Sequence, residues 1–328
     1  MQPRKLRKGD EVRIISPSKS LATKSSSIIK EAEKKLLNMG LKVSYGKNSS
    51  ECDKFGSSSI KSRLSDLKQA LLDENVKIII PFSGGFNSNQ LLKHINYSLI
   101  KKNPKIFCGF SDITVLLNSI YAKTDLTTYS GPNFSTFAMK KGFDYTLKSF
   151  KEAFFNGKIR EIKPAKTWSD DQWWENQKKR NFYKNEGYWV MNKPKSKVSG
   201  KILGGNLCSF NLLQGTEFMP NLTDSVLFIE DDNIMGDLFI YEFDRNLQSL
   251  IQQKNFSKVK ALVVGRFEKK TGITKSILKK ILLSKKELQK IPIIANVDFG
   301  HTSPQFIFPI GGKVKIDILS SQKAKLYI

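Results

Sequence analysis

The first 155 residues alternate short apolar runs with segments of helical periodicity. The apolar runs lie at residues 11–18, 41–46, 76–82, 105–110 and 127–132. Helical segments separate them, among them residues 25–39, which end before Gly40, and residues 60–75. Apolar strands without polar alternation, separated by helices, are typical of parallel sheets buried on both faces. The pattern therefore predicts a doubly wound α/β domain, with ligands at the carboxyl ends of its strands.

The pattern changes between about residues 157 and 198, which are polar and charged. All four tryptophans of the chain fall in this stretch, namely Trp168, Trp173, Trp174 and Trp189. Apolar runs then return at 199–206, 225–232, 260–267, 292–300, 305–318 and 323–328, with helical segments near 206–214, 237–253 and 273–289. We therefore expect an N-terminal α/β domain over residues 1–160, a Trp-rich linker over 161–198, and a smaller β-rich C-terminal domain over 199–328.

Length and composition agree with two globular domains. The chain has 328 residues, of which 39% are hydrophobic, and a domain usually has about 100 to 200 residues. No window approaches the roughly 20 apolar residues of a membrane span, and the basic N-terminus lacks the apolar region of a secretory signal. We expect a cytoplasmic protein that does not associate with membranes. The three cysteines, Cys52, Cys108 and Cys208, form no CxxC pair, which predicts buried free thiols and no metal site.

The chain is strongly basic, with 55 Lys and Arg against 30 Asp and Glu and a net charge of +25. Such a field attracts anions and can bind nucleic acid without specificity. The lysines are scattered over nearly every segment, however, including helical faces such as "KSILKKILLSKKELQK". This distribution is more typical of a solvated surface, so we expect no specific nucleic-acid partner.

The stretch "IFCGFSDITVL", residues 106–116, places Ser111 and Asp112 between an apolar run and a helical segment. Ser and Asp are common N-cap residues, because their side-chain oxygens accept the free N–H groups of a first helical turn. A sharp turn from strand to helix is also how many hydrolases expose a nucleophilic serine, although the G-x-S-x-G pattern is only half met. These residues alone favour the cap slightly.

Only two histidines are available as a general base near neutral pH. His94 lies in "NQLLKHINYS" and is interpreted as structural, whereas His301 follows an apolar run in the loop "DFGHTSP". Glu230 closes the run "SVLFIEDD", where a carboxylate either ends a strand or orients an imidazole. Asp231 and Asp232 are alternatives for that role. They do not have the spacing of a calcium loop.

Two glycine pairs and the Trp-rich stretch complete the candidates. "FSGGFNSN" at 82–89 and "ILGGNLCSF" at 202–210 are tight turns, or loops whose N–H groups approach an anion. The full nucleotide-binding glycine patterns are absent. The Trp-rich stretch is a packed lid, a base-stacking platform or an aromatic clamp, and the lid is favoured on these residues alone.

Taken in order, these segments resemble the family of serine peptidases that contains LD-carboxypeptidases and microcin C immunity (MccF) proteins. The matching stretches are "GDEVRIISPS", "SRLSDLKQAL", "IIIPFSGGFNSNQLL", "GFSDITVLLNSIYAKT", "TYSGP", "GKILGGNL", "LLQGTEFMP", "LFIEDD" and "FGHTSPQFIFPIG". They extend from residue 9 to residue 311, which is nearly the whole chain. Each is weak alone, but their joint order and spacing are specific.

The resemblance implies a flavodoxin-like N-terminal domain and a smaller C-terminal domain, with the active site in the crevice between them. It implies Ser111 as nucleophile, His301 as general base and Glu230 as its orienting partner. The N–H groups of Gly85 and Asp112 are then expected to form the oxyanion hole. The expected substrate-binding residues are Trp173, Trp174, Asn87, Ser88 and Asn206. The resemblance also implies a homodimer without cofactor or metal.

The two branches of the family differ in substrate. LD-carboxypeptidases remove the terminal D-alanine from murein tetrapeptides, whereas MccF-like enzymes cut the bond between an aminoacyl group and a nucleotide in microcin C-type inhibitors. "GGFNSN" and the Trp-rich insertion are more similar to the MccF-like branch, in which a Trp stacks on adenine. We therefore expect a small peptide or peptidyl-nucleotide substrate of microcin C type. A murein carboxypeptidase is the alternative, and a non-catalytic protein that binds polyanions is a third reading.

Overall fold

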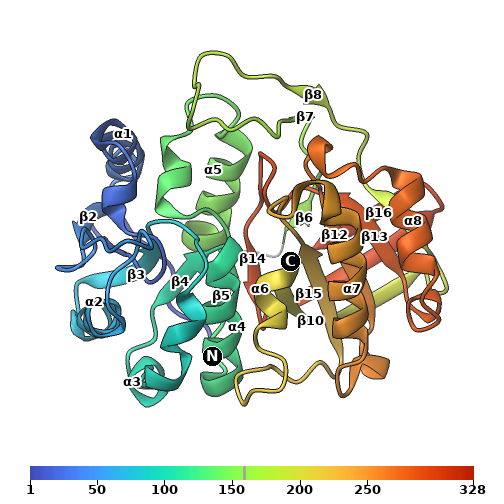
Figure 1. Ribbon diagram of the computed structural model, residues 1–328, viewed down its shortest axis with the longest axis horizontal. Coiled ribbons are helices and arrows are strands. Elements are labelled where there is room, and N and C mark those ends of the chain that lie inside the picture. Colours follow the sequence, from blue (N-terminus) through green and yellow to red (C-terminus); the bar gives the residue numbers. More distant parts are fainter. Residues whose placement is uncertain (158–159) are drawn as a thin grey trace.

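A computed structural model describes residues 1–157 and 160–328 of the chain. Two lobes lie side by side, one built mainly from the first 157 residues and the other from the last 130 (Figure 1). A long extended segment passes over one end of both lobes. No helix among the described residues is long and apolar enough to cross a membrane.

The N-terminal lobe contains a six-stranded sheet in the order β14-β5-β4-β3-β1-β2. Its five N-terminal strands are parallel: β1 (Glu11–Ile15), β2 (Lys42–Tyr45), β3 (Val76–Pro81), β4 (Ile106–Gly109) and β5 (Thr128–Ser130). The central strands are buried on both faces, as their unbroken apolar runs predict. The predicted doubly wound domain is confirmed.

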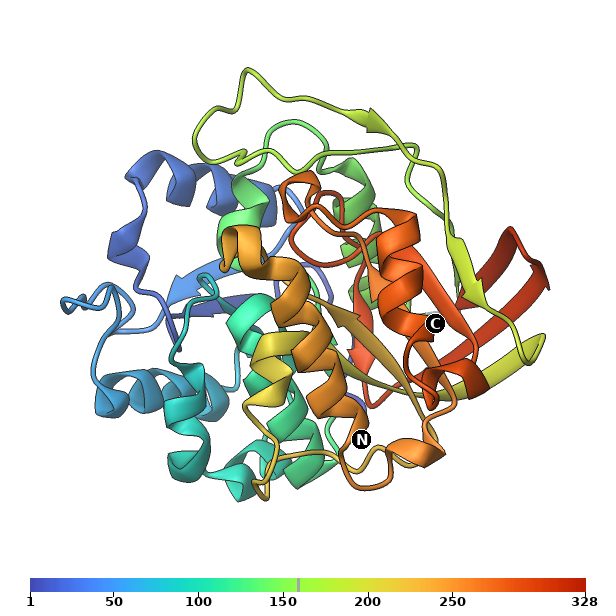
Figure 2. The same ribbon diagram turned by 45° about the vertical axis from the view of Figure 1, so that its right-hand side comes forward.

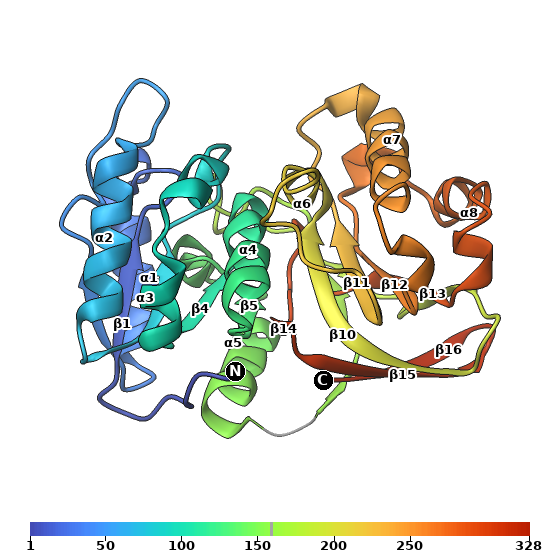
Figure 3. The same ribbon diagram turned by 90° about the horizontal axis from the view of Figure 1, so that it is seen from below.

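Helices cover both faces of this sheet (Figure 3). They are α1 (Ser26–Leu37), α2 (Ile60–Leu72), α3 (Tyr97–Lys102), α4 (Thr114–Thr124) and α5 (Asp144–Lys151). Buried residues of α1 and α5 share one apolar cluster, and those of α2, α3 and α4 share another. The helices over 25–39 and 60–75 are therefore confirmed, although each ends two or three residues before its predicted limit.

The C-terminal lobe contains an eight-stranded sheet in the order β6-β16-β15-β10-β11-β12-β13-β9. Its longer strands are β10 (Lys197–Asn206), β11 (Ser225–Glu230), β12 (Ala261–Gly265), β13 (Ile293–Val297), β15 (Lys313–Ser320) and β16 (Lys323–Tyr327). The four central strands, β10 to β13, are parallel. The helices of this lobe are α6 (Leu207–Asn211), α7 (Phe239–Ile251) and α8 (Lys275–Leu283). The predicted second, strand-rich domain is confirmed.

No single position in the chain separates the strands of one sheet from those of the other. The apolar run at 305–318 was expected to lie within the C-terminal domain, but its first part forms β14 (Phe308–Ile310), which pairs antiparallel with β5 of the N-terminal sheet. Two strands of the expected linker, β6 (Glu161–Ile162) and β9 (Trp189–Asn192), form opposite edges of the C-terminal sheet. Edge positions favour these exchanges, because an edge strand has unpaired backbone groups that another segment can satisfy.

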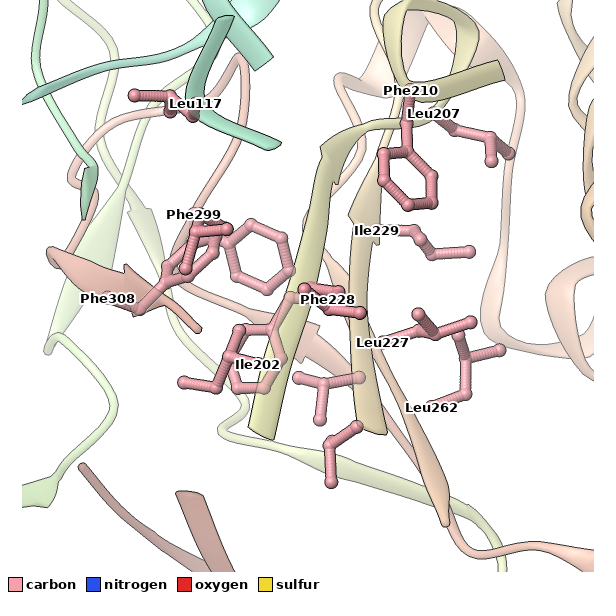
Figure 4. Packing of buried hydrophobic residues seen from close by; sticks show 14 of the residues in the cluster. Leu117, Ile202, Leu207, Phe210, Leu227, Phe228, Ile229, Leu262, Phe299 and Phe308 are labelled. Carbon is pink, nitrogen blue, oxygen red and sulfur yellow. The ribbon is translucent and has the colours of Figure 1, made fainter. Parts of the chain in front are cut away.

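One apolar core continues across the two lobes. It includes Leu117 of α4 together with Ile202, Phe228 and Phe299 of the C-terminal lobe and Phe308 of β14 (Figure 4). Phe308 lies 4.9 Å from Phe228 and 5.2 Å from Phe299 between ring centroids. Separation of the lobes would expose these rings to water, so burial holds the lobes in a fixed relation.

Residues 163–188, which we call the strap, form the extended segment over both lobes (Figure 2). Within it β7 (Thr167–Trp168) pairs with β8 (Tyr183–Lys184). The backbones of Ser169 and Ser303 exchange two hydrogen bonds of 2.8 Å, and the fully buried Arg180 side chain donates to Ser303 Oγ over 3.1 Å. The strap is thereby attached to the loop that contains His301.

The cysteines are all free, as expected, but they are not all buried. Cys108 is buried and Cys208 is partly buried, whereas Cys52 is exposed. Cys52 lies in the loop between β2 and α2, outside both apolar clusters. The expectation of three buried thiols is therefore wrong for Cys52.

Candidate active site

Ser111 lies immediately after β4, at the start of a short 3₁₀ turn that leads into α4. Its backbone has a φ of +66°, a conformation that costs free energy for any residue with a Cβ. Within the part of the chain that the structure describes, its side chain caps no helix; the hydroxyl instead lies 3.0 Å from Nε2 of His301. The cap interpretation is therefore wrong, and the strained turn presents the hydroxyl to an imidazole.

Glu230 and His301 reach Ser111 from the C-terminal lobe. Glu230 is the last residue of β11 and is buried, and its Oε2 lies 2.7 Å from Nδ1 of His301. His301 follows Gly300 in the loop after β13. Gly300 has a φ of +105°, and a Cβ there would lie 2.6 Å from Glu230 Oε2. Only glycine allows this approach. The structure thus brings the three predicted residues into one hydrogen-bonded chain.

The electrostatics of this chain favour a charged imidazole. Burial by itself lowers the pKa of His301, but the charge and hydrogen bond of Glu230 raise it, and Asp232 and Glu268 add to this effect, so that the pKa is raised to about 9. Oδ2 of Asp232 lies 3.7 Å from Nε2. The site is therefore able to stabilise a proton on His301 after it leaves Ser111. His94 lies in a separate 3₁₀ turn and does not take part.

The carboxylate of Asp112 organises the neighbouring glycine loop, residues 83–88. Its Oδ2 accepts the N–H groups of Asn87 and Ser88 over 3.1 and 3.0 Å, and the hydroxyl of Ser18 over 2.6 Å. Ser88 is fully buried, and its hydroxyl donates to the backbone oxygen of Asp112. Asn87 and Ser88 therefore hold the loop in place, and neither belongs to the lining of the cavity at Ser111, where the sequence placed them as substrate-binding residues.

Gly84 and Gly85 bring this loop against Ser111. A Cβ on Gly84 would lie 2.8 Å from Cβ of Ser111, and one on Gly85 would lie 2.2 Å from Ser18 Oγ. The loop backbone can approach Ser111 only because these side chains are absent. Both glycines line the cavity beside Ser111, which is where N–H donors for an oxyanion are needed.

Asn206 supports the acidic residues after β11 and is buried. Its Nδ2 donates to Asp231 Oδ1 and Asp232 Oδ2 over 3.2 Å each, and its Oδ1 caps α6 at the Ser209 N–H. Asn206 is absent from the cavity lining, so its position indicates a supporting role and not direct substrate contact. Burial, together with Glu230 and Asp232, raises the pKa of Asp231 to about 7.

Among the described residues, Cys208, Asp231 and Asp232 bring metal-ligand atoms within 4.8 Å of one another. Burial raises the pKa of the Cys208 thiol, and its Sγ donates to Asn206 Oδ1 over 3.0 Å. A protonated thiol is a poor metal ligand. The group therefore fits a hydrogen-bonded framework behind Glu230 better than a metal centre.

A cavity of about 370 Å³ opens at Ser111 between the lobes and beneath the strap. Residues from all three parts line it: Lys19, Lys24, Ile28, Ser83, Gly84, Gly85, Phe86, Phe110, Ser111, Asn133, Ser135, Thr136, Gln172, Trp173, Trp174, Asp232, Asn233, Ile234, Glu268, Lys270 and His301. Its size suits a small-molecule or short-peptide substrate.

The two adjacent tryptophans differ in their surroundings. Trp173 is only 8% exposed and belongs to the apolar cluster under α1, whereas Trp174 is 44% exposed. The Lys24 ammonium lies 5.4 Å from the centroid of the Trp174 ring. Trp173 thus anchors the strap to the N-terminal lobe, and Trp174 contributes an exposed aromatic ring to the lining of the cavity.

The sequence reasoning missed several charged residues of the cavity. Lys19 and Lys24 follow β1, and Glu268 and Lys270 follow β12. They could have been proposed from the rule that ligands bind at the carboxyl ends of parallel strands. Lys19 and Lys24 were missed because no local sequence feature distinguishes them from the many lysines that face solvent.

A serine, a histidine and a glutamate in one hydrogen-bonded chain, at the carboxyl ends of strands and between two α/β lobes, are typical of the hydrolase class. Residues 12–131 match the model of the LD-carboxypeptidase N-terminal domain, and residues 199–316 match that of the C-terminal domain. The chain belongs to this peptidase family.

Three relatives show the range of names within the family. YocD of Bacillus subtilis, which has a provisional carboxypeptidase name, is 49% identical and aligns over 98% of this chain and 97% of its own. The microcin C7 self-immunity protein MccF of Escherichia coli is 31% identical over 94% and 91%. A second B. subtilis protein, provisionally named as a murein peptide carboxypeptidase, is 28% identical over 96% and 91%.

Solved structures give the same assignment. The MccF-like protein of Bacillus anthracis superposes with a TM-score of 0.98 at 48% identity, covering 100% of this chain and 99% of its own. MccF in complex with aspartyl sulfamoyl adenosine superposes with a TM-score of 0.88 at 29% identity, covering 100% and 98%.

Proposed function

We propose that this chain is a serine peptidase in which Ser111 is the nucleophile, His301 the general base and Glu230 the residue that orients His301. The observation that supports this proposal is the continuous hydrogen-bonded chain from Ser111 Oγ through His301 to Glu230, at a cavity of substrate size. The positive φ of Ser111 is further support, because a strained backbone at such a position is typical of a functional residue.

In the proposed reaction, Ser111 Oγ attacks the amide carbonyl carbon while its proton moves to Nε2 of His301. The carbonyl oxygen becomes an oxyanion, and the N–H groups of Gly85 and Asp112 are the proposed donors to it. The C–N bond then breaks, and His301 returns the proton to the leaving nitrogen. Water, deprotonated by the same imidazole, hydrolyses the acyl-serine and restores the hydroxyl.

The proposed substrate is an amide between an aminoacyl or peptidyl group and a nucleotide, as in microcin C-type inhibitors, and the proposed role is immunity or detoxification. Trp174 supports it, because its exposed face and the Lys24 ammonium beside it suit a nucleobase and a phosphate-like anion. The similarity to MccF bound to aspartyl sulfamoyl adenosine also supports it.

The alternative is removal of D-alanine from a murein tetrapeptide. The family model and the B. subtilis murein-type relative favour it. The C-terminal carboxylate of such a peptide would meet Lys19 or Lys24 in the same cavity. This substrate has no nucleobase, so the exposed Trp174 face would not contribute.

The two substrates can be compared in one mixture. Wild type and Ser111→Ala are incubated with a murein tetrapeptide and aspartyl sulfamoyl-adenosine, and the products are followed by mass spectrometry. Release of sulfamoyl-adenosine by wild type alone supports the nucleotide reaction, and loss of D-alanine supports murein recycling. If wild type cleaves neither and Ser111 resists a serine-directed reagent, the peptidase proposal fails and polyanion binding becomes the better reading.

The homodimer and the cytoplasmic location stay predictions. Sedimentation at several protein concentrations tests the first, and cell fractionation tests the second.

A further inference from the structure

The glycine pair of "ILGGNLCSF" lies inside a strand, not in the turn or loop that the sequence predicts. Gly204 and Gly205 belong to β10 and are in register with β11, and their φ values are +110° and +130°. A Cβ on Gly204 would lie 2.3 Å from the backbone oxygen of Phe228. One on Gly205 would lie 2.6 Å from Oγ1 of Thr114 in α4. The glycines therefore allow β10 to pass closely between β11 and α4 of the N-terminal lobe (Figure 3).

Side chains of α4 complete the edge of β10 that lies opposite β11. The antiparallel strand β15 pairs with the first half of this edge. Further along, Gly204 donates its N–H to Asn118 Oδ1 over 3.1 Å, and its backbone oxygen accepts from Asn118 Nδ2 over 2.8 Å. Two residues later, Asn206 donates its N–H to Thr114 Oγ1 over 3.0 Å. Buried backbone groups need hydrogen-bond partners, and here α4 supplies them in place of a neighbouring strand.

The two side chains of α4 are well suited to this contact. Thr114 and Asn118 are both buried, and they are four positions apart, so they lie on the same face of the helix. A primary amide has donors and an acceptor, as a peptide group does. Asn118 uses both, because Nδ2 also donates to the Thr114 backbone oxygen over 2.8 Å while Oδ1 accepts from Gly204. An apolar side chain at position 118 would leave the backbone groups of Gly204 buried and without these partners.

This contact joins the two parts of the candidate active site. Ser111 precedes Thr114 by three residues, and its 3₁₀ turn leads directly into α4. In the other lobe, Asn206 is in register with Glu230 of the neighbouring strand. Oε2 of Glu230 lies 2.7 Å from Nδ1 of His301. The contact between α4 and β10 is therefore one helical turn away from Ser111 and one strand away from the residue that orients His301.

The apolar core between the lobes resists their separation more than a small sliding movement. Hydrophobic burial has no preferred direction, whereas a hydrogen bond depends steeply on distance and angle. The distance from Ser111 Oγ to His301 Nε2 is 3.0 Å, and these atoms belong to different lobes. A displacement of about 1 Å would break this hydrogen bond, and such a displacement can slow a reaction about 100-fold. Directional contacts near Ser111 are therefore needed to keep the site assembled.

We propose that Asn118 and Thr114 are positioning residues, which hold α4 against the edge of β10 and so keep Ser111 within hydrogen-bond distance of His301. The inference rests on the proposed function, because it assumes that Ser111 transfers its proton to His301. Neither Asn118 nor Thr114 belongs to the lining of the cavity, so neither is placed to touch a substrate. Loss of their contact should slow the reaction of Ser111 and leave the pair of His301 and Glu230 intact.

The test is the rate at which a fluorophosphonate labels Ser111, measured by peptide mass spectrometry over a range of pH. This reagent needs a serine activated by a base and no particular substrate. For Thr114→Val, which keeps the shape of the side chain, we expect the limiting rate at high pH to fall about 10- to 100-fold. Asn118→Leu removes both hydrogen bonds to Gly204 and should reduce the rate at least as much. The pH midpoint should not move, because Glu230 and His301 lie in the same lobe.

Two further variants separate this role from a general loss of stability. Thr114→Ser retains the hydroxyl and should restore most of the labelling rate. Thr124 is a buried threonine at the other end of α4, whose hydroxyl donates to the Ile120 backbone oxygen over 2.6 Å and accepts the Leu126 N–H over 3.1 Å. These contacts lie within the N-terminal lobe. Thr124→Val should therefore be less stable in denaturant unfolding and still be labelled at the wild-type rate.

The outcomes distinguish the two proposals. If Ser111 is labelled in wild type, and in Thr114→Val and Asn118→Leu at rates within about threefold of it, the positioning role is wrong and the peptidase proposal stands. The positioning role is also wrong if Thr124→Val is slowed as much as Thr114→Val. If Asn118→Leu does not fold, the comparison of Thr114→Val with Thr114→Ser decides. If Ser111 of wild type resists the reagent, the proposed nucleophile is wrong and the positioning role falls with it.

Discussion

The hydroxyl of Ser18 donates to Oδ2 of Asp112 over 2.6 Å and joins the loop after β1 to the turn after β4. The same carboxylate oxygen accepts two N–H groups from the glycine loop that follows β3. Three strand ends are therefore fixed around one buried carboxylate. This arrangement sets the distance between the glycine loop and Ser111, and with it the space in which an oxyanion can be bound.

Ser18→Ala is expected to destabilise the protein by about 1.5 to 3 kcal/mol, because a hydrogen bond to a buried carboxylate is lost. The glycine loop would then be less firmly held, so kcat should decrease while KM changes less. Denaturant unfolding and steady-state kinetics measure the two effects. Ser135→Ala is the matched control, since Ser135 is a serine of the same cavity and, among the described residues, has no hydrogen bond to Asp112. A stable Ser18→Ala variant with wild-type kcat would contradict the role of this link.

Ser111→Ala is expected to lower kcat by about 10⁴-fold or more, as removal of a nucleophile does in other serine hydrolases. Its thermal unfolding should remain close to that of wild type, because the hydroxyl has a hydrogen bond only to His301 among the described residues. Labelling with a serine-directed reagent, checked by peptide mass mapping, should be lost in Ser111→Ala and in His301→Ala. Labelling of another serine at the same rate would place the nucleophile elsewhere.

The activity of the free enzyme is expected to increase with pH. His301 must be unprotonated to accept the Ser111 proton, and its pKa is raised to about 9 by Glu230, Asp232 and Glu268 against the effect of burial. The profile of kcat/KM should therefore rise toward a plateau above pH of about 9. Glu230→Gln removes the negative charge beside His301 and weakens the hydrogen bond to it. The midpoint of the kcat/KM profile should therefore move to lower pH, and its plateau should fall. An unmoved midpoint would assign the titration to another group.

The free energy of unfolding, unlike the activity, should decrease as the pH rises. The folded-state pKa of His301 lies above the ordinary value of 6.5, so folding binds a proton there. The resulting stabilisation is fully present below about pH 6.5 and is lost as the pH rises through about 9. Denaturant unfolding at several pH values checks this, with His301→Gln as the variant in which the dependence should be reduced.

Trp174→Ala is expected to reduce kcat/KM for a nucleotide substrate by an amount equivalent to about 1 to 3 kcal/mol, the contribution of one base stack. Cleavage of a murein peptide should be nearly unaffected. Trp173→Ala should behave differently, because that ring is buried in an apolar cluster, and its removal should cost about 3 to 5 kcal/mol of stability. Equal kinetic losses for both substrates in Trp174→Ala would argue against base stacking.

The order of elements was available from the sequence, because burial on both faces of a parallel strand leaves an unbroken apolar run in the chain itself. Ser111, Glu230 and His301 could be proposed because each follows or ends such a run and because histidine is scarce. Their meeting was implied only by family resemblance, since Ser111 and His301 are separated by 190 positions and His301 and Glu230 by 71.

Other features depended on the tertiary structure alone. Phe308–Ile310 joined the N-terminal sheet because an edge of β5 was free to pair. The local sequence of a strand does not show which distant strand edge it will pair with. Asn87, Ser88 and Asn206 turned out to hold Asp112, Asp231 and Asp232, because hydrogen-bond partners are chosen by proximity in space. The opposed charges of Lys19 and Glu268 likewise exist only where two lobes face each other. Hydrophobic periodicity predicted the apolar strands and helices, whereas packing decided which polar residues are buried and which of them meet.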